Sequence, residues 1–452
     1  MTIDINIVNG KIFTSEGFKE GGLSIEGEKI IRLGKEPNLE KASQKINVKG
    51  AMILPGLIDI HVHMRDLEQK YKETMETGTR SAIAGGVTTV LDMPNNKPPT
   101  NLALRVEYKK KIVTGKAAAN IGFYSLIPNN TEEIVNLTKE GIFGFKIYPA
   151  GAIYPPKNNE LLKTRMAKIA EMKLPLIIHP DSGFADETEK LFLEKHQDPI
   201  NSFLAAHNQL DEAQALVDFL QINKKINCHL HCAHITAKET MEIMIENKDL
   251  KTLTGEVCPH HLFLTQKDLL KFKANAKCLP PLRTKEDQKI LWKALNDDHL
   301  NIIATDHAPH SHNEKYCEFE AAASGIHGLE TLLPVMFTGA FKGMIPLEKL
   351  IPKMTSNPAE YALIKQRGEI KEGNFADLII VTKEKSVVSA EHFESNAKWT
   401  PFDGFESEVT LKQVFVNGHL AKDDEFVESK AKAGKILERR LQIEKEILEP
   451  SE

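Results

Sequence analysis

Two histidines separated by one residue follow an apolar stretch of the chain. Residues 53–60 are mostly aliphatic and predict a strand over 53–61 that has His61 at its end. Side chains at positions i and i+2 of a strand point to the same side, so His61 and His63 can converge on one metal ion. Arg65 has the same parity and places a cation beside that candidate site. Taken alone, the two histidines could equally be solvated side chains at a strand end.

Further histidines and a carboxylate stand at the ends of other predicted strands. A single histidine at a strand end is more often structural. Several strands that bring imidazoles and a carboxylate to one face are typical of a hydrolytic Zn²⁺ site. One strand leaves a choice, because His229 and His231 share a face and His234 lies on the opposite parity. The candidates at these ends are Asn95, Lys146, His179, His229, His231, His234, Asp306 and His310.

Lys146 stands among these candidates, in Gly144-Phe145-Lys146-Ile147-Tyr148. A lysine ammonium cannot bind a metal ion and would be repelled by one. An amine that burial has deprotonated can instead react with CO₂, and the resulting carbamate is an anion able to bridge two metal ions. The commoner fate of a lysine is to reach solvent or to pair with an acid. The position of Lys146 among candidate ligands favours the carbamate.

Asp306 has two roles open to it in such a site. A carboxylate that contacts both a water molecule and the substrate can take the proton of the water and pass it to the leaving nitrogen. As a ligand it would help to hold the metal, which lowers the pKa of a bound water toward ~7. Metal ligand and general base are therefore both possible roles of Asp306.

Short apolar strands alternate with charged, amphipathic helical stretches from residue 53 to residue 365. Repeated β-then-α units predict a parallel sheet, and their number fits a closed (β/α)₈ barrel of the TIM type. In such a barrel, functional side chains come from the C-terminal ends of the strands. A doubly wound open sheet is the alternative. The strands are predicted over 53–61, 87–93, 119–126, 142–148, 174–179, 226–234, 251–257 and 300–306.

Segments with short strands flank the predicted barrel on both sides. Residues 1–52 contain the hairpin signal Asn9-Gly10, and residues 366–425 contain several β-branched runs. We expect these two segments to pair into one small β-sandwich domain built from both chain ends. Residues 426–452 have apolar residues spaced among Lys and Glu, which predicts a terminal helix lying on a surface. That helix could support a homodimer or could cap the barrel in solvent.

The composition excludes several classes of function. A net charge of −5 gives no electrostatic basis for binding nucleic acid or an anionic membrane. No apolar run approaches the ~18 residues needed to cross a bilayer, and residues 1–20 do not have the pattern of a signal peptide. The five cysteines do not have zinc-finger spacing and predict reduced thiols. We therefore expect a cytoplasmic enzyme that acts on a small molecule.

Three motifs are more specific than the histidine pair alone: His61-Val62-His63-Met64-Arg65, Met93-Pro94-Asn95 and Thr305-Asp306-His307-Ala308-Pro309-His310. Together they resemble the amidohydrolase superfamily and, within it, the dihydroorotase family. The likeness extends from the N-terminal strands to Asn417-Gly418. Further matching segments are 144–148, 259–262, 280–283, 325–331, 357–359 and 373–378.

The resemblance implies a binuclear zinc centre. The match of residues 231–236 to the family pattern selects His234, rather than His229 or His231, as the ligand from its strand. Carboxylated Lys146 and a hydroxide would bridge the two ions. The remaining ligands implied are His61, His63 and Asp306 for one zinc and His179 and His234 for the other.

The resemblance also implies a substrate that carries a carboxylate. Arg65, Asn95 and His310 match positions that hold this group, and a guanidinium pairs well with a carboxylate. The implied reaction is the reversible conversion of N-carbamoyl-L-aspartate into (S)-dihydroorotate in pyrimidine biosynthesis. One position departs from the family, which commonly has Asn where this chain has Leu279. An aliphatic side chain cannot hydrogen-bond to the pyrimidine ring.

Two other hypotheses compete with this one. Dihydropyrimidinases, hydantoinases and allantoinases belong to the same superfamily, and their substrates lack the same ring carboxylate. Arg65 argues against them, whereas Leu279 argues weakly for them. A catalytically silent homologue that serves as a scaffold would usually have lost ligands, and here every matched ligand is present.

Overall fold

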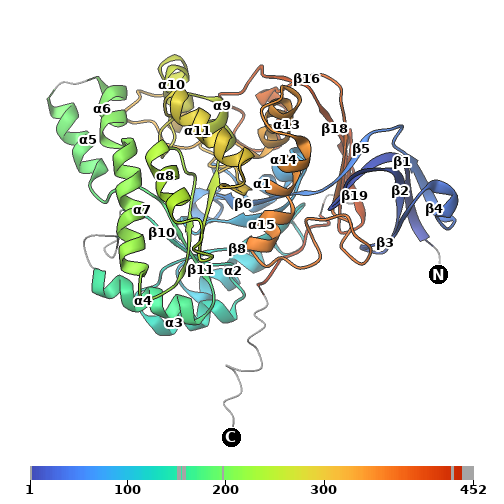
Figure 1. Ribbon diagram of the computed structural model, residues 1–452, viewed down its shortest axis with the longest axis horizontal. Coiled ribbons are helices and arrows are strands. Elements are labelled where there is room, and N and C mark those ends of the chain that lie inside the picture. The colour runs from blue at the N-terminus through green and yellow to red at the C-terminus, as the bar shows by residue number, and fades with distance from the viewer. Residues whose placement is uncertain (1–2, 150–153, 155–158, 196–197, 429–431, 440–452) are drawn as a thin grey trace, which may run out of the picture.

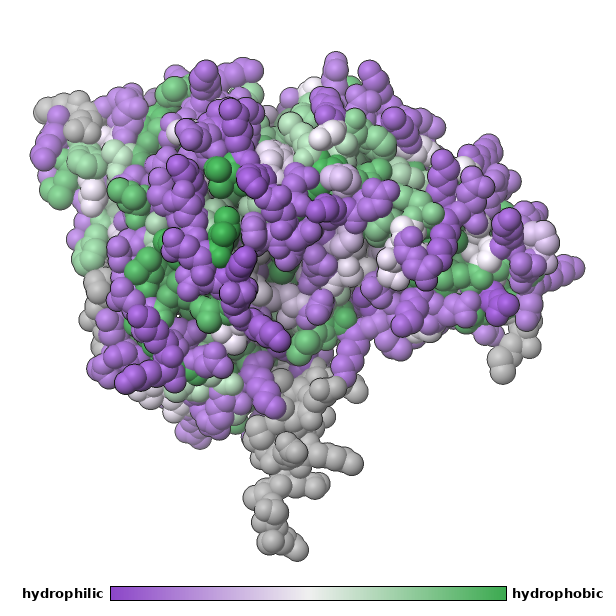
Figure 2. Space-filling view, in the orientation of Figure 1, coloured by the Kyte–Doolittle hydropathy of each residue, from purple (hydrophilic) through white to green (hydrophobic). Residues whose placement is uncertain are grey.

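The computed structural model describes residues 3–149, 154, 159–195, 198–428 and 432–439. A parallel barrel wrapped by helices forms the larger part, and a β-domain lies beside it (Figure 1). Figure 2 shows hydrophilic side chains spread over this face of both parts. None of the helices in the described residues combines the length and the apolar character needed to cross a bilayer.

The barrel strands pair in parallel in two hydrogen-bonded runs, β6-β7-β8 and β9 to β14. Only Tyr124 separates β8 from β9, and Val62 of β6 pairs with His307 just beyond β14. The ring therefore closes, which confirms the predicted barrel and excludes the open sheet. The strands are β6 (Leu57–Val62), β7 (Val87–Asp92), β8 (Asn120–Phe123), β9 (Ser125–Leu126), β10 (Phe145–Ile147), β11 (Pro175–Ile178), β12 (His229–Cys232), β13 (Leu253–Val257) and β14 (Ile302–Ile303).

Helices cover the outside of the barrel and bury their apolar faces against it. Polar residues fix where several of them begin. Thr284, for example, accepts a hydrogen bond from the backbone N–H of Asp287 and caps α11. The helices are α1 (Met75–Ala84), α2 (Ala103–Val113), α3 (Thr131–Lys139), α4 (Asn159–Glu171), α5 (Ala185–Glu194), α6 (Pro199–Ala206), α7 (Gln209–Asn223), α8 (Lys238–Glu246), α9 (Pro259–Phe263), α10 (Gln266–Phe272), α11 (Lys285–Asn296), α12 (His312–Lys315), α13 (Leu332–Phe341), α14 (Leu347–Lys353) and α15 (Ser356–Tyr361).

The β-domain joins both ends of the chain in one nine-stranded sheet. Leu23 and Ile30 share a buried cluster with Phe415, although several strands separate them in the sheet order. Lys29 of β3 also pairs with Phe375, and the Ile30 N–H donates to Asn374 O at 2.9 Å, so the edge strand β3 reaches back to the segment just before β15. The sheet therefore curls around its own core. Its strands are β1 (Ile3–Thr14), β2 (Gly17–Glu26), β3 (Lys29–Gly34), β4 (Ala42–Asn47), β5 (Met52–Pro55), β15 (Leu378–Thr382), β18 (Thr410–Val416), β19 (His419–Asp423) and β20 (Glu425–Phe426).

The single strand expected over 53–61 is two strands that belong to different sheets. The first, β5, pairs with β1 and β15 in the β-domain, and the second, β6, begins the barrel. Gly56 lies between them, where a Cβ atom would be 2.2 Å from Thr88 Oγ1. The chain therefore crosses from one sheet to the other at a residue that must have no side chain. A small separate ribbon pairs β16 (Ser386–Val387) with β17 (Glu406–Ser407).

The predicted C-terminal helix is wrong for the residues that the structure describes. Residues 432–439 run extended beside β8, where Ile436 pairs with Ile121 and Leu437 N–H donates to Ile121 O at 2.7 Å. Gly434 permits this approach, because a Cβ atom there would be 2.1 Å from Ala119 O. Backbone hydrogen bonds to the barrel thus replace those of a helix. Residues 429–431 and 440–452 of the predicted helix lie outside the described residues.

Candidate metal centre and substrate pocket

His61, His63 and Asp306 form a compact cluster at the C-terminal end of the barrel. One ligand atom of each lies within 4.8 Å of those of the other two. Asp306 Oδ1 is 3.0 Å from His63 Nε2 and 3.4 Å from His61 Nε2. The backbone N–H of His63 donates to His307 O at 2.8 Å, at the place where the barrel closes. Closure of the barrel therefore brings together residues that are far apart in the sequence.

His179 and His234 complete a continuous group of imidazoles. They follow β11 and β12, their ring centroids are 4.4 Å apart, and the His234 ring is 5.3 Å from that of His61. Burial lowers the pKa of both histidines well below the usual value, so their rings are neutral and offer lone pairs. The buried Nδ1 of His234 has no hydrogen-bond partner. His229 and His231 point elsewhere in the barrel, toward Thr254.

Lys146 lies on β10 with its amine enclosed by protein. The side chain is fully buried, and Nζ has no hydrogen-bond partner in the part of the chain that the structure describes. Burial lowers its pKa to about 8, against the opposing charges of Glu256 and Asp306. Nζ is 5.2 Å from the centre of the Tyr148 ring. The amine therefore neither reaches solvent nor forms an ion pair, which were the two ordinary fates considered from the sequence.

Two oxygen acceptors orient the histidines from behind. Asn95 Oδ1 is 2.6 Å from His63 Nδ1, and a carboxylate oxygen of Glu256 hydrogen-bonds to His61 Nδ1. Each contact places the proton on Nδ1 and leaves Nε2 free to bind a metal. Burial favours the protonated acid, yet the neighbouring His61 and His231 hold the pKa of Glu256 well below its usual value. Glu256 is therefore an ionised, fully buried partner of a candidate ligand.

Sequence reasoning missed Glu256, although a signal was present. It is a lone carboxylate in the predicted strand 251–257, next to the apolar Val257. A buried acid in a barrel strand needs a partner, and the only way to find that partner is to know which strands face each other. Spacing also could not reveal Lys72, which lies before α1 and reaches the pocket from a loop.

A pocket of about 280 Å³ opens directly onto this cluster. Arg65 is buried at one side, where Nε donates to Pro309 O at 3.1 Å and Nη2 lies 3.1 Å from His310 Nε2. Lys72 Nζ donates to His310 Nδ1 at 3.2 Å and pairs with Glu314 at 2.7 Å. The lining residues are His61, His63, Arg65, Gln69, Lys72, Asn95, Tyr148, His179, His234, Leu279, Asp306, Ala308, His310, Ser324 and Gly325.

The pocket thus has a metal-ligand side, a cationic side and an apolar side. Burial, followed by the charge of Arg65, lowers the pKa of His310, so this ring is neutral and the positive charge belongs to Arg65 and Lys72. Leu279 provides the apolar side. An anionic group of a small molecule would find charge-assisted donors within reach of the candidate ligands.

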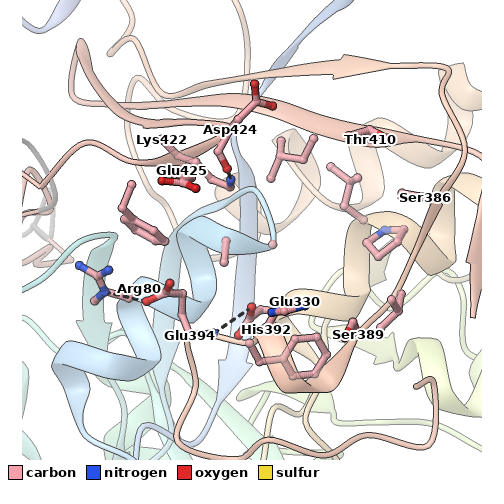
Figure 3. A pocket seen from close by; sticks show the side chains of 18 of the residues that line it. Arg80, Glu330, Ser386, Ser389, His392, Glu394, Thr410, Lys422, Asp424 and Glu425 are labelled. Carbon is pink, nitrogen blue, oxygen red and sulfur yellow. Dashed lines mark hydrogen bonds and ion pairs between the residues drawn. The ribbon is translucent and has the colours of Figure 1, made fainter. Parts of the chain in front are cut away.

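A larger cavity, of about 730 Å³, lies elsewhere, between α1, α13 and the strands β18 to β20 (Figure 3). Arg80 is paired with two glutamates at this cavity. Arg80 Nε donates to Glu394 at 2.9 Å and Arg80 Nη2 to Glu428 at 3.0 Å, while Glu330 accepts from the backbone N–H of Glu394 at 3.1 Å. None of the candidate ligands from the sequence lines this cavity.

Comparisons with known proteins agree with this geometry. The sequence pattern of the Amidohydrolase family matches residues 52–421. Dihydroorotase of Pyrococcus horikoshii is 34% identical over 433 residues, which cover 95% of each chain. Dihydroorotase of Methanosarcina acetivorans is 31% identical over 450 residues, which cover 96% of this chain and 95% of that one.

The solved structure of L-hydantoinase (dihydropyrimidinase) from Arthrobacter aurescens is 25% identical in sequence to this chain and superposes with a TM-score of 0.91. The superposition covers 97% of this chain and all of that one. Metal dependence is general in the family that these relatives share, and this chain gathers a matching group of donors. The chain therefore belongs to the amidohydrolase family and, within it, to the dihydroorotase family.

Proposed function

We propose that this protein catalyses the reversible interconversion of N-carbamoyl-L-aspartate and (S)-dihydroorotate, a step of pyrimidine biosynthesis. The observation that carries the proposal is the buried guanidinium of Arg65, which lines the same pocket as the metal-ligand cluster. An isolated buried cation is costly, and a carboxylate is the natural partner for a planar guanidinium. The full-length similarity to dihydroorotases supports the same substrate.

The donors fit two zinc ions. His61, His63 and Asp306 would hold one ion, and His179 and His234 the other. Neutral imidazoles together with a carboxylate are the ligands that hydrolytic zinc sites use. When bound, zinc supplies Lewis-acid activation of the amide carbonyl and of the attacking water. The unpartnered lone pair at His234 Nδ1 supports a ligand at this place.

Lys146 would lie between the two ions as a carbamate. Its neutral amine nitrogen would bond to the carbon of CO₂ and lose one proton to solvent, which converts the neutral amine into an anionic carbamate. The buried amine without a partner supports this step, because the neutral amine is the reactive form and the lowered pKa favours it. A resident ammonium in the same place would repel the ions.

The residues of the chain divide the remaining work. Arg65, assisted by His310 and by Asn95 at the edge of the pocket, would hold the substrate carboxylate and fix the ring. In ring opening, water adds to the cyclic amide carbonyl and the C–N bond breaks. Asp306 would take the proton of the water and deliver it to the departing nitrogen, and ring closure reverses these transfers.

A second candidate function is hydrolysis of an uncharged cyclic amide. Leu279 favours it, because an aliphatic wall cannot make the hydrogen bonds that a pyrimidine ring would accept. The structural likeness to hydantoinases points the same way. Arg65 favours the charged substrate, because its guanidinium would have no partner on a hydantoin or dihydrouracil ring.

A parallel assay separates the two functions. The zinc-loaded protein is given dihydroorotate, hydantoin, dihydrouracil and allantoin at matched concentrations, and kcat/KM is measured for each. We expect dihydroorotate to be preferred by ~10²-fold or more, the discrimination typical of a site built for a polar substituent. Turnover of dihydroorotate no faster than that of the uncharged rings would refute the proposed function. The cytoplasmic location and a homodimer stay predictions from the sequence.

A further inference from the structure

A second cluster of metal-binding side chains lies outside the pocket. Cys258 directly follows β13, and His260 and His261 lie in the short helix α9 that begins at the next residue. One ligand atom of each lies within 4.8 Å of those of the other two, and all three side chains are buried. None of them lines the substrate pocket or belongs to the ligand set proposed above.

Each of the two imidazoles has a nitrogen atom with no hydrogen-bond partner among the described residues. His261 Nε2 lies 3.1 Å from Pro280 O and must be its N–H donor, so the lone pair is on Nδ1, which has no partner. His260 Nε2 is likewise buried without a partner, and the two ring centroids are 4.2 Å apart. A buried polar atom without a partner is destabilising, so two in adjacent residues call for a ligand.

We propose that Cys258, His260 and His261 bind a further zinc ion, separate from the centre that acts on the substrate. Zinc accepts a thiolate with imidazoles, and three protein ligands suffice to hold it. On binding, the Cys258 thiol loses its proton to solvent and the sulfur bonds to the ion. Through the bond from His261 to Pro280, the ion would anchor the turn that presents Leu279 to the pocket.

Cys278 provides a matched control. It is as deeply buried as Cys258 and lies 3.9 Å from His261, but at Nε2 rather than at the free Nδ1. Its own Sγ lies 3.3 Å from Pro280 O. A substitution at Cys278 therefore perturbs the same neighbourhood and leaves the three proposed ligands in place.

Cobalt substitution tests the site, because a thiolate bound to Co²⁺ gives a charge-transfer band in the near ultraviolet. None of the ligands proposed for the centre at the pocket is a thiol, so the band reports on a cysteine site alone. We expect the band in the Co²⁺-loaded protein, together with one more equivalent of metal than in Cys258→Ser. That variant should lack the band, and Cys278→Ser should keep both the band and the metal.

Several outcomes would overturn the site. The first is that protein whose other metal sites are filled shows no band. The second is that Cys258→Ser still shows the band, and the third is that Cys278→Ser loses it. If Cys258→Ser does not fold, His260→Gln must instead lower the metal content by one equivalent. The proposed function can fail independently of this site. Protein that shows the band but does not turn over dihydroorotate would refute the proposed function and still support the zinc site.

Discussion

The two cavities of this protein differ in volume and also in whether the polar groups around them have partners. The pocket at the end of the barrel measures about 280 Å³, and the cavity beside the β-domain measures about 730 Å³. Around the small pocket, the amine of Lys146 and Nδ1 of His234 are buried without partners. Around the large one, Arg80 is paired with two glutamates.

The difference shows what marks a reactive site. Charges that satisfy one another have little to gain from a ligand, whereas buried groups without partners gain much from one. The larger cavity therefore has the properties of a gap between domains, and the smaller pocket has those of a binding site. Substitutions on the two sides should accordingly have very different effects.

Lys146→Ala should have the largest effect. Removal of the amine removes the group proposed to bridge the ions, and we expect loss of bound zinc and a fall in kcat of ~10³-fold or more. Zinc content by mass spectrometry and initial rates check this. Lys353→Met is the control, since Lys353 is also buried but pairs with Asp298 at 2.8 Å. Unchanged zinc content in Lys146→Ala would disprove the carbamate assignment.

Arg65→Met should follow in size, and its effect should depend on the substrate. We expect kcat/KM for dihydroorotate to fall by ~10²-fold, because a carboxylate would lose its bidentate partner. Rates for an uncharged ring should change much less. Arg80→Met, in the large cavity, should leave both rates unchanged. An equal loss on charged and uncharged substrates would mean that Arg65 does not bind the carboxylate.

Glu256→Gln tests whether the hydrogen bond between His61 and Glu256 helps the cluster to bind metal. The carboxylate holds His61 by its Nδ1, and such partners typically contribute ~10-fold or more to metal affinity. We expect weaker zinc binding in competition with a chelator and a smaller change in kcat of the zinc-saturated enzyme. Thr254→Val is the control, because Thr254 contacts His231 but not His61. If Glu256→Gln binds zinc as tightly as the wild type does, Glu256 does not support His61 as a metal ligand.

Glu330→Gln concerns the large cavity and should affect stability rather than catalysis. Burial raises the pKa of Glu330 from 4.5 to about 8. The folded protein therefore holds a proton that the unfolded chain releases, and stability from this group is full below pH 4.5 and lost as the pH rises toward 8. The slope is at most ~1.4 kcal/mol per pH unit. Denaturant titrations of the variant should show a flatter dependence over this range, and an unchanged dependence would contradict the assignment.

Leu279→Asn should have the smallest effect. An amide in place of the aliphatic wall can hydrogen-bond to the ring of dihydroorotate, and one such bond contributes ~0.5–1.5 kcal/mol. We expect KM for dihydroorotate to fall by a few fold with little change in kcat. Steady-state kinetics with dihydroorotate and hydantoin check this. A KM that rises for dihydroorotate would show that the pocket does not place the ring against this residue.

The sequence was informative where structure depends on local pattern. Alternating apolar strands and amphipathic helices predicted the barrel, and the structure gathers the candidate residues His61, His179, His234 and Asp306 at the C-terminal ends of its strands. This works because the strands of a parallel barrel all present their C-terminal ends at one face. Strand parity could not choose between His231 and His234, because His234 lies beyond the end of β12, where the chain no longer alternates.

Tertiary structure alone decided the contacts between residues distant in the sequence. The bond from Glu256 to His61 depends on which strands face each other across the barrel. Residues 432–439 have the composition of a helix, yet they run extended because the edge of β8 offers backbone partners and Gly434 allows close approach. Local pattern fixes which residues can form an element, whereas the partners available in the folded chain decide which of the competing hydrogen bonds is made.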